Sequence, residues 1–116
     1  MSVQRLTASI RSPKNPGKPA LMPYLVSGYP TLAGFGDLLR QAGAVADAIE
    51  VGVPFSDPMA DGPVIQVASR QALDNGVNLT WILDQLRQAG DVGAPTVLMS
   101  YVNPLLAYGF DRVVKD

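Results

Sequence analysis

Short apolar runs alternate with stretches of helical periodicity along the chain, and this pattern predicts most of its secondary structure. Short apolar runs that are bounded by Gly or Pro favour buried strands. We therefore expect strands over residues 20–27, 45–51 and 95–101. Apolar residues spaced three or four positions apart predict amphipathic helices. This spacing predicts helices over residues 2–11, 31–43, 63–75, 80–89 and 110–116, with a helical turn over 105–108.

Capping residues and prolines indicate where several helices begin and end. Thr31 has a side-chain oxygen suited to an N-cap, and Pro63 fits the first helical position, where its missing N–H is no loss. The next helix is expected to begin at Asn78 or Thr80 and to end before Gly90.

Two features of the pattern indicate how the elements pack. Pro23 lies inside the first predicted strand and favours an edge position or a bulge, because proline cannot donate to the hydrogen-bond ladder. In the helix that Pro63 begins, the residues that follow at helical spacing up to Asn75-Gly76 are Val64, Val67, Ala68, Gln71 and Ala72.

The order of strands and helices predicts an α/β fold with a parallel sheet. Strands joined by helical crossovers lie parallel, and parallel sheets need both faces covered. Three strands leave at least one long parallel edge unpaired, which natural domains avoid. We therefore expect the chain to be part of a larger α/β protein, with the sequence stopping inside its last helix.

Composition narrows the kinds of chemistry that the chain can carry. Its 116 residues are 47% hydrophobic and 16% charged, with a net charge of −1 and no Cys or His. The scattered basic residues make nucleic acid and anionic membranes improbable partners. Without Cys or His, catalysis must use carboxylates, hydroxyls, Lys or Arg. With no signal peptide or membrane span recognisable, a cytoplasmic location is the expectation.

Glu50 is the first candidate for chemistry, because it lies inside an apolar strand just before a loop with two aspartates. Strand alternation gives it only small neighbours on its own face, namely Ala46, Ala48 and Gly52. Such a carboxyl is either paired with a Lys or Arg, or desolvated with its pKa raised, which suits general acid catalysis. Catalytic residues of (β/α) barrels lie at the carboxyl ends of strands, and this favours the second interpretation.

Asp57 and Asp61 follow Glu50 in the loop and have several interpretations. Ser-Asp-Pro and Asp-Gly-Pro are common turn sequences, so both aspartates can be turn or cap residues. Together with Glu50 they also offer oxygen ligands for Mg²⁺ or Ca²⁺, although their spacing matches no calcium loop.

Aromatic and apolar residues near the predicted strand ends are candidates for a pocket wall. They are Tyr24, Phe55, Met99 and Tyr101, and the simpler alternative is that they belong to the core. No glycine-rich nucleotide motif occurs in the sequence.

The stretch after the second strand resembles a signature of the tryptophan synthase alpha chain family. It is Glu50-Val-Gly-Val-Pro-Phe-Ser-Asp-Pro-Met-Ala-Asp-Gly-Pro63, a long ordered motif. The resemblance continues through residues 23–30, 74–76 and 98–104 and covers nearly all of the chain from Ala20 onward. It implies the N-terminal part of a TIM (β/α)8 barrel, with about three parallel strands and their crossover helices. Residues 1–116 would then be a partial barrel domain, truncated within the third barrel helix.

The resemblance implies a lyase that cleaves indole-3-glycerol phosphate by a retro-aldol reaction to indole and glyceraldehyde 3-phosphate. Glu50 matches the family's acid/base, and Asp61 matches the carboxylate that binds the indole N–H. Residues at the positions that line the substrate pocket are Tyr24, Met99 and Tyr101. No metal or cofactor is implied for this chain, because PLP belongs to the β chain of the expected α2β2 assembly. Asp57 and Pro58 match the loop that faces that β chain.

The sequence is also compatible with two rival functions. The chain can be a non-catalytic fragment that retains only the docking loop for the β chain. It can also be an unrelated TIM-barrel aldolase or isomerase, which is disfavoured because no lysine at a strand end can form a Schiff base. The phosphate-binding loops that barrels carry after later strands have no counterpart in this sequence.

Overall fold

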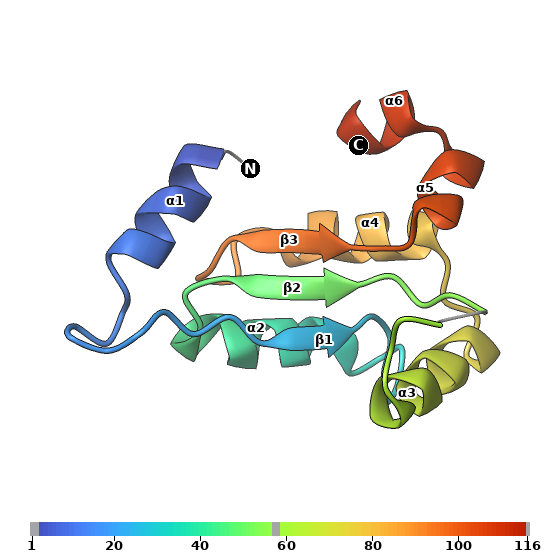
Figure 1. Ribbon diagram of the computed structural model, residues 1–116, viewed down its shortest axis with the longest axis horizontal. Helices are drawn as coiled ribbons and strands as arrows, with labels where there is room; N and C mark the ends of the chain where they lie inside the picture. Colours follow the sequence, from blue (N-terminus) through green and yellow to red (C-terminus); the bar gives the residue numbers. More distant parts are fainter. Residues whose placement is uncertain (1–2, 57–58, 116) are drawn as a thin grey trace.

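The computed structural model describes residues 3–56 and 59–115. Strands and helices alternate through most of this part of the chain (Figure 1). In order they are α1 (Val3–Arg11), β1 (Tyr24–Val26), α2 (Phe35–Val45), β2 (Ile49–Gly52), α3 (Pro63–Asp74), α4 (Leu79–Ala89), β3 (Thr96–Met99), α5 (Val102–Tyr108) and α6 (Phe110–Lys115).

The three strands form a parallel sheet in the order β1-β2-β3, as the alternation of elements predicted. Glu50 in the central strand pairs in register with Tyr24 on one side and Val97 on the other. All three strands therefore present their carboxyl ends at the same edge (Figure 1). The strands are shorter than predicted, since α2 extends to Val45 and β2 begins only at Ile49.

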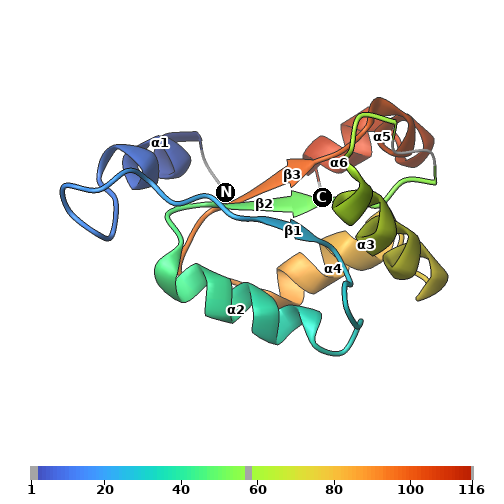
Figure 2. The ribbon, with the colours of Figure 1, turned by 60° about the horizontal axis from the view of Figure 1, so that its bottom comes forward.

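Helices α2 and α4 lie on one face of the sheet and enclose the core with it (Figure 2). Phe35 and Leu39 of α2, Ile82 of α4, and Ile49 and Val51 of β2 are fully buried between these layers. No described helix covers the middle of the opposite face (Figures 1 and 2). Glu50 lies on this open face, because it alternates along β2 with the buried Ile49 and Val51. None of the helices within residues 3–56 and 59–115 is long and apolar enough to span a membrane.

Local chemistry explains how α3 and α4 begin. Pro63 is the first residue of α3, and the side chain of Asn78 caps α4 by accepting the Trp81 N–H at 2.8 Å. The prediction that Thr31 caps α2 is wrong, because the helix begins at Phe35. The Thr31 hydroxyl instead accepts the Gly34 N–H at 3.1 Å and closes a turn ahead of the helix.

Helix α3 buries only part of the set that helical spacing indicates, namely Ala68 and Ala72. Its buried residues are Ala68, Ser69 and Ala72, whereas Val64 is 80% exposed and Val67 is 66% exposed. The helix packs beside the end of β1 and not across the sheet, so only one narrow side of it meets the core.

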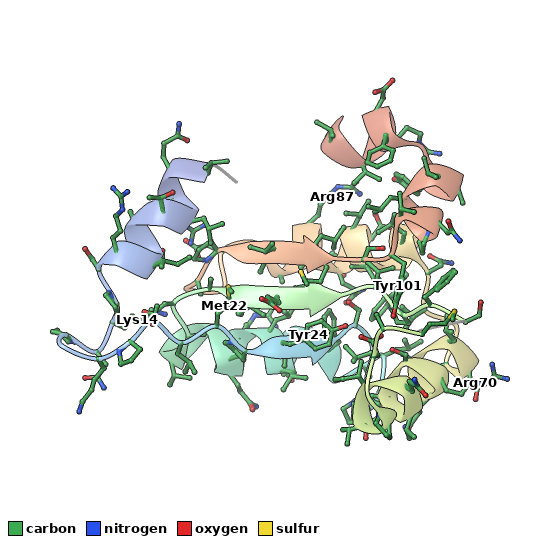
Figure 3. All side chains as sticks on the ribbon, in the orientation of Figure 1. Lys14, Met22, Tyr24, Arg70, Arg87 and Tyr101 are labelled. Carbon is green, nitrogen blue, oxygen red and sulfur yellow. The ribbon has the colours of Figure 1, made fainter. Side chains whose placement is uncertain are left out.

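Asp47 and Lys14 join the N-terminal segment to the amino end of the sheet, opposite the end where Tyr101 lies (Figure 3). Asp47 is 5% exposed, and its carboxylate accepts the backbone N–H groups of Lys14 and Leu21, each at 2.7 Å. The Lys14 ammonium donates to the carbonyls of Gly43 and Gly93. The backbone bonds from Leu21 and then Lys14 lower the pKa of Asp47, because they stabilise its charged form.

Candidate active site

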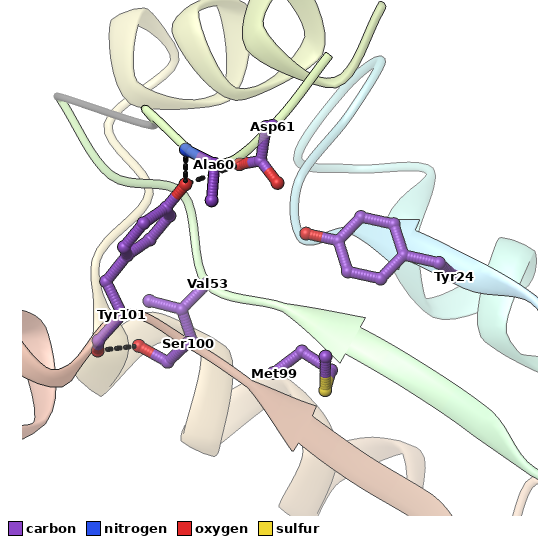
Figure 4. A pocket seen from close by; sticks show the side chains of 7 residues that line it. All are labelled: Tyr24, Val53, Ala60, Asp61, Met99, Ser100 and Tyr101. Atoms are coloured by element: carbon purple, nitrogen blue, oxygen red, sulfur yellow. Dashed lines mark hydrogen bonds between the residues drawn. The ribbon is translucent and has the colours of Figure 1, made fainter.

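A pocket of about 240 Å³ opens at the carboxyl end of the sheet, beside the loop that leads into α3 (Figure 4). Its lining residues are Tyr24, Val53, Ala60, Asp61, Met99, Ser100 and Tyr101. They come from β1, from β3 and from the segments that follow β2 and β3. The structure thus brings Asp61 together with the three pocket residues expected from the sequence.

Tyr24 owes its position in the pocket to a glycine on the neighbouring strand. Its ring extends along the open face of the sheet over Gly52, where an added Cβ atom would stand only 2.1 Å from the Tyr24 Oη. Gly52 therefore provides the space that the ring fills. The Tyr24 hydroxyl reaches into the pocket on the side where Asp61 lies (Figure 4).

Both candidate acids affect the pKa of Tyr24. Burial raises the pKa of Tyr24 most, and the negative charge of Asp61 and then of Glu50 raises it further. Both carboxylates oppose ionisation of the phenol, so its hydroxyl stays protonated well into alkaline solution.

Glu50 lies beside the pocket, in register with Tyr24 of the pocket wall. It is half-buried in the central strand next to Tyr24, but it is not part of the pocket wall. Within the described residues, no lysine or arginine forms an ion pair with it. The structure therefore offers no support for the interpretation of Glu50 as one half of a structural salt bridge.

Asp61 is held by contacts from two directions. The hydroxyl of Tyr101 lies 3.4 Å from the Asp61 Oδ2 and also accepts the Ala60 N–H at 2.9 Å (Figure 4). From the other side, the Gln66 side-chain amide donates to the Asp61 carbonyl at 2.8 Å. Asp61 is thus more than a turn residue, since its carboxylate points into the pocket.

Phe55 does not line the pocket as expected. Its ring stacks on Tyr101, with centroids 5.3 Å apart and an interplanar angle of 30°, and so supports the pocket from behind. Asp57 and Pro58, the expected partner contacts, lie outside the described residues. The described acidic residues form no group of three that could hold a metal ion.

Comparison with known proteins assigns the chain to a family. The family model named tryptophan synthase alpha chain matches residues 10–116. The chain belongs to this family. A curated relative, the tryptophan synthase alpha chain of Nitratidesulfovibrio vulgaris, is 52% identical over 118 residues, a match that covers 100% of this chain and 46% of the relative.

Solved structures of tryptophan synthase have the same arrangement of strands and helices. The enzyme from M. tuberculosis gives a TM-score of 0.85 at 36% identity, covering 96% of this chain and 46% of that one. Tryptophan synthase subunit alpha from Legionella pneumophila gives a TM-score of 0.81 at 37% identity, covering 93% of this chain and 42% of that one. The fold is therefore the N-terminal part of a TIM barrel, as the resemblance implied. The chain spans less than half the length of each of these proteins.

Three pocket residues of this alpha-chain segment were not predicted from the sequence. Val53 and Ser100 directly follow β2 and β3, so their positions at strand ends could have indicated them. Ala60 enters the pocket because its N–H bonds to Tyr101, a residue 41 positions away. No local sequence pattern indicates that contact.

Proposed function

We propose that this chain supplies the acid/base residues of an active site that cleaves indole-3-glycerol phosphate to indole and glyceraldehyde 3-phosphate. The observation that carries the proposal is the position of Asp61 in a pocket walled by two tyrosines and Met99, with Glu50 in register with one of those tyrosines, Tyr24. A flat apolar ring with one N–H donor suits such a pocket, because the Asp61 carboxylate is the strongest hydrogen-bond acceptor in the pocket wall.

The proposed chemistry needs two carboxylates with different tasks. Asp61 accepts the indole N–H and stabilises the positive charge that builds on the ring when C3 is protonated. Glu50 donates and accepts protons at the reacting carbons. The hydroxyl on the glycerol side chain of the substrate loses its proton, and the carbon that carries it becomes the aldehyde carbon. The electron pair of the broken carbon–carbon bond returns to the indole ring. Tyr24, Met99 and Tyr101 bind the ring in this proposal.

The same proposal covers the partners of the chain. A PLP-dependent β chain receives the indole in an α2β2 assembly, and Asp57 and Pro58 contact that chain. This chain itself needs no cofactor, and the reaction takes place in the cytoplasm. The support is membership in the tryptophan synthase alpha chain family.

The experiment uses a chimera in which residues 1–116 replace the matched segment of the Nitratidesulfovibrio vulgaris relative. We expect the chimera to release indole from indole-3-glycerol phosphate. Glu50→Gln should lower turnover by about 10²- to 10⁴-fold, the usual contribution of general acid–base catalysis, with little change in substrate binding.

Asp37→Asn is the matched control, because it removes an exposed carboxylate of α2 whose side chain is 80% exposed. It should leave turnover unchanged. Equal turnover in Glu50→Gln and in the unaltered chimera would disprove the catalytic assignment. A chimera that folds and binds the β chain without releasing indole would favour the alternative of a docking fragment.

A further inference from the structure

Tyr101 makes contacts that differ from those of a simple pocket wall. Its backbone is fixed between β3 and α5 as the N-cap residue of α5, and its carbonyl accepts the Ser100 hydroxyl at 2.7 Å. Its ring is stacked on Phe55. The backbone of Tyr101 and its ring are therefore both fixed by contacts, so its hydroxyl has a well-defined position.

The Tyr101 hydroxyl uses both of its hydrogen-bonding functions on one short segment. It accepts the N–H of Ala60 at 2.9 Å and donates toward the Oδ2 of Asp61 at 3.4 Å (Figure 4). A phenol has one proton to donate and lone pairs to accept, so both contacts can form together. Tyr101 thus ties the segment before α3 to the end of β3.

We propose that Tyr101 is a positioning residue for Asp61. By binding the Ala60 N–H it fixes the backbone beside Asp61, and by donating to Oδ2 it orients the carboxylate. The Oδ1 atom then stays available to a ligand N–H in the pocket. The consequence for catalysis rests on the proposed function, whereas the hold on the Ala60–Asp61 segment does not.

Gln66 supports this assignment from the opposite side. Its amide donates to the Asp61 carbonyl at 2.8 Å, which fixes the peptide that follows the carboxylate-bearing residue. The N–H of Ala60 is thus bound by the Tyr101 hydroxyl, and the carbonyl of Asp61 by the Gln66 amide, so side chains fix the backbone of two consecutive residues. The Tyr101 hydroxyl also reaches the carboxylate of Asp61, so it is the group to test.

The first test measures hydrogen–deuterium exchange at the Ala60 amide in the 116-residue chain. Tyr101→Phe keeps the ring and its stacking on Phe55 but removes the acceptor for that amide. We expect exchange at Ala60 to accelerate roughly 2- to 10-fold, the range for loss of one ordinary hydrogen bond. Tyr29→Phe is the matched control, because this tyrosine lies in the loop after β1, and it should change nothing at Ala60. Unchanged exchange in Tyr101→Phe would overturn the proposal.

The second test separates positioning from substrate contact by using the chimera described above. Tyr101→Phe should lower kcat on the order of 10- to 100-fold with KM nearly unchanged, because a misdirected Asp61 weakens transition-state stabilisation. A raised KM with unchanged kcat would assign the hydroxyl to substrate binding and overturn the positioning role. If the unaltered chimera releases no indole, the proposed function fails, and the exchange measurement still decides whether Tyr101 holds the segment.

Discussion

Tyr24 is the residue through which the candidate site can be observed directly. Its ring fills the space above Gly52, and its hydroxyl lies near both candidate acids. Most active-site carboxylates have no convenient spectroscopic signal, whereas ionisation of a phenol changes its ultraviolet absorption. The titration of Tyr24 therefore reports the charge of Asp61 and Glu50.

Replacing Asp61 with Asn should lower the pKa of Tyr24. Burial is the largest cause of the raised pKa and stays in the variant, but the largest charge that opposes phenolate formation is removed. The pKa should therefore move toward its ordinary value without reaching it. An absorbance titration between about pH 8 and 12 measures this shift, since an unperturbed tyrosine titrates near 10.

Two further variants make that titration decisive. Tyr24→Phe identifies which part of the absorbance change belongs to Tyr24. Glu50→Gln should produce a smaller shift than Asp61→Asn, because Glu50 is the weaker of the two charge effects. A titration that is the same in Asp61→Asn and in the unaltered chain would mean that the two side chains are not neighbours.

At the scale of elements, the sequence predicts where a helix begins when the residue that starts it lies next to the helix in the chain. Pro63 and Asn78 begin α3 and α4 because a missing N–H and a side-chain acceptor act within one turn. Thr31 has the same chemistry but closes a turn that precedes α2. The exposure of Val64 and Val67 depends on where α3 packs, and the periodicity of one helix does not contain that information.

In the candidate site, too, some features could be predicted from the sequence and others could not. The parallel topology places residues from strand ends at one edge, so the meeting of Tyr24, Asp61 and Met99 could be predicted from the sequence. The role of Phe55 behind Tyr101 and the bond from Ala60 to Tyr101 depend on the path of a loop. Neither contact has a local sequence signal.

The contacts of Asp47 predict a pH-dependent attachment of the N-terminal segment. Its pKa is lowered in the folded chain by the N–H groups of Leu21 and Lys14. The stabilisation is therefore fully present above the unfolded pKa of about 3.9 and is lost as the pH falls through the lower, folded value. Asp47→Asn should lower stability at neutral pH, and the difference from the unaltered chain should shrink in acid.

Urea unfolding at a series of pH values measures this effect. Asp84→Asn is the control, because it breaks an exposed pair with Arg87 within α4, and such a pair contributes about 0–1 kcal/mol. If Asp47→Asn and the unaltered chain keep the same stability difference from neutral pH down to about pH 2, the carboxylate charge does not hold this segment.

At the scale of the whole molecule, the sheet has one covered face and one open face. The Cα radius of gyration is 14.2 Å, slightly above the roughly 13 Å expected for a compact domain of this length. In the described part of the chain, no strand pairs with the outer edges of β1 and β3. Helices α2 and α4 protect only one side of this sheet (Figure 2).

The open face predicts that the isolated 116-residue chain associates with itself. Unpaired edges of parallel strands are templates for pairing, and apolar side chains beside them strengthen the contact. Met22 is 44% exposed and lies two residues before Tyr24, on the open face (Figure 3). We expect sedimentation velocity to show mass that increases with concentration.

Met22→Lys should weaken this association at least several-fold, because a charge on the open face must be desolvated when a second copy covers it. Val3→Lys introduces the same charge on α1, where the native side chain is already 77% exposed, and should leave the association unchanged. Equal weakening by both variants would indicate general charge repulsion between chains. Sedimentation as a monomer at every concentration would show that the open sheet is stable without a partner, and the edges of β1 and β3 would then not drive assembly.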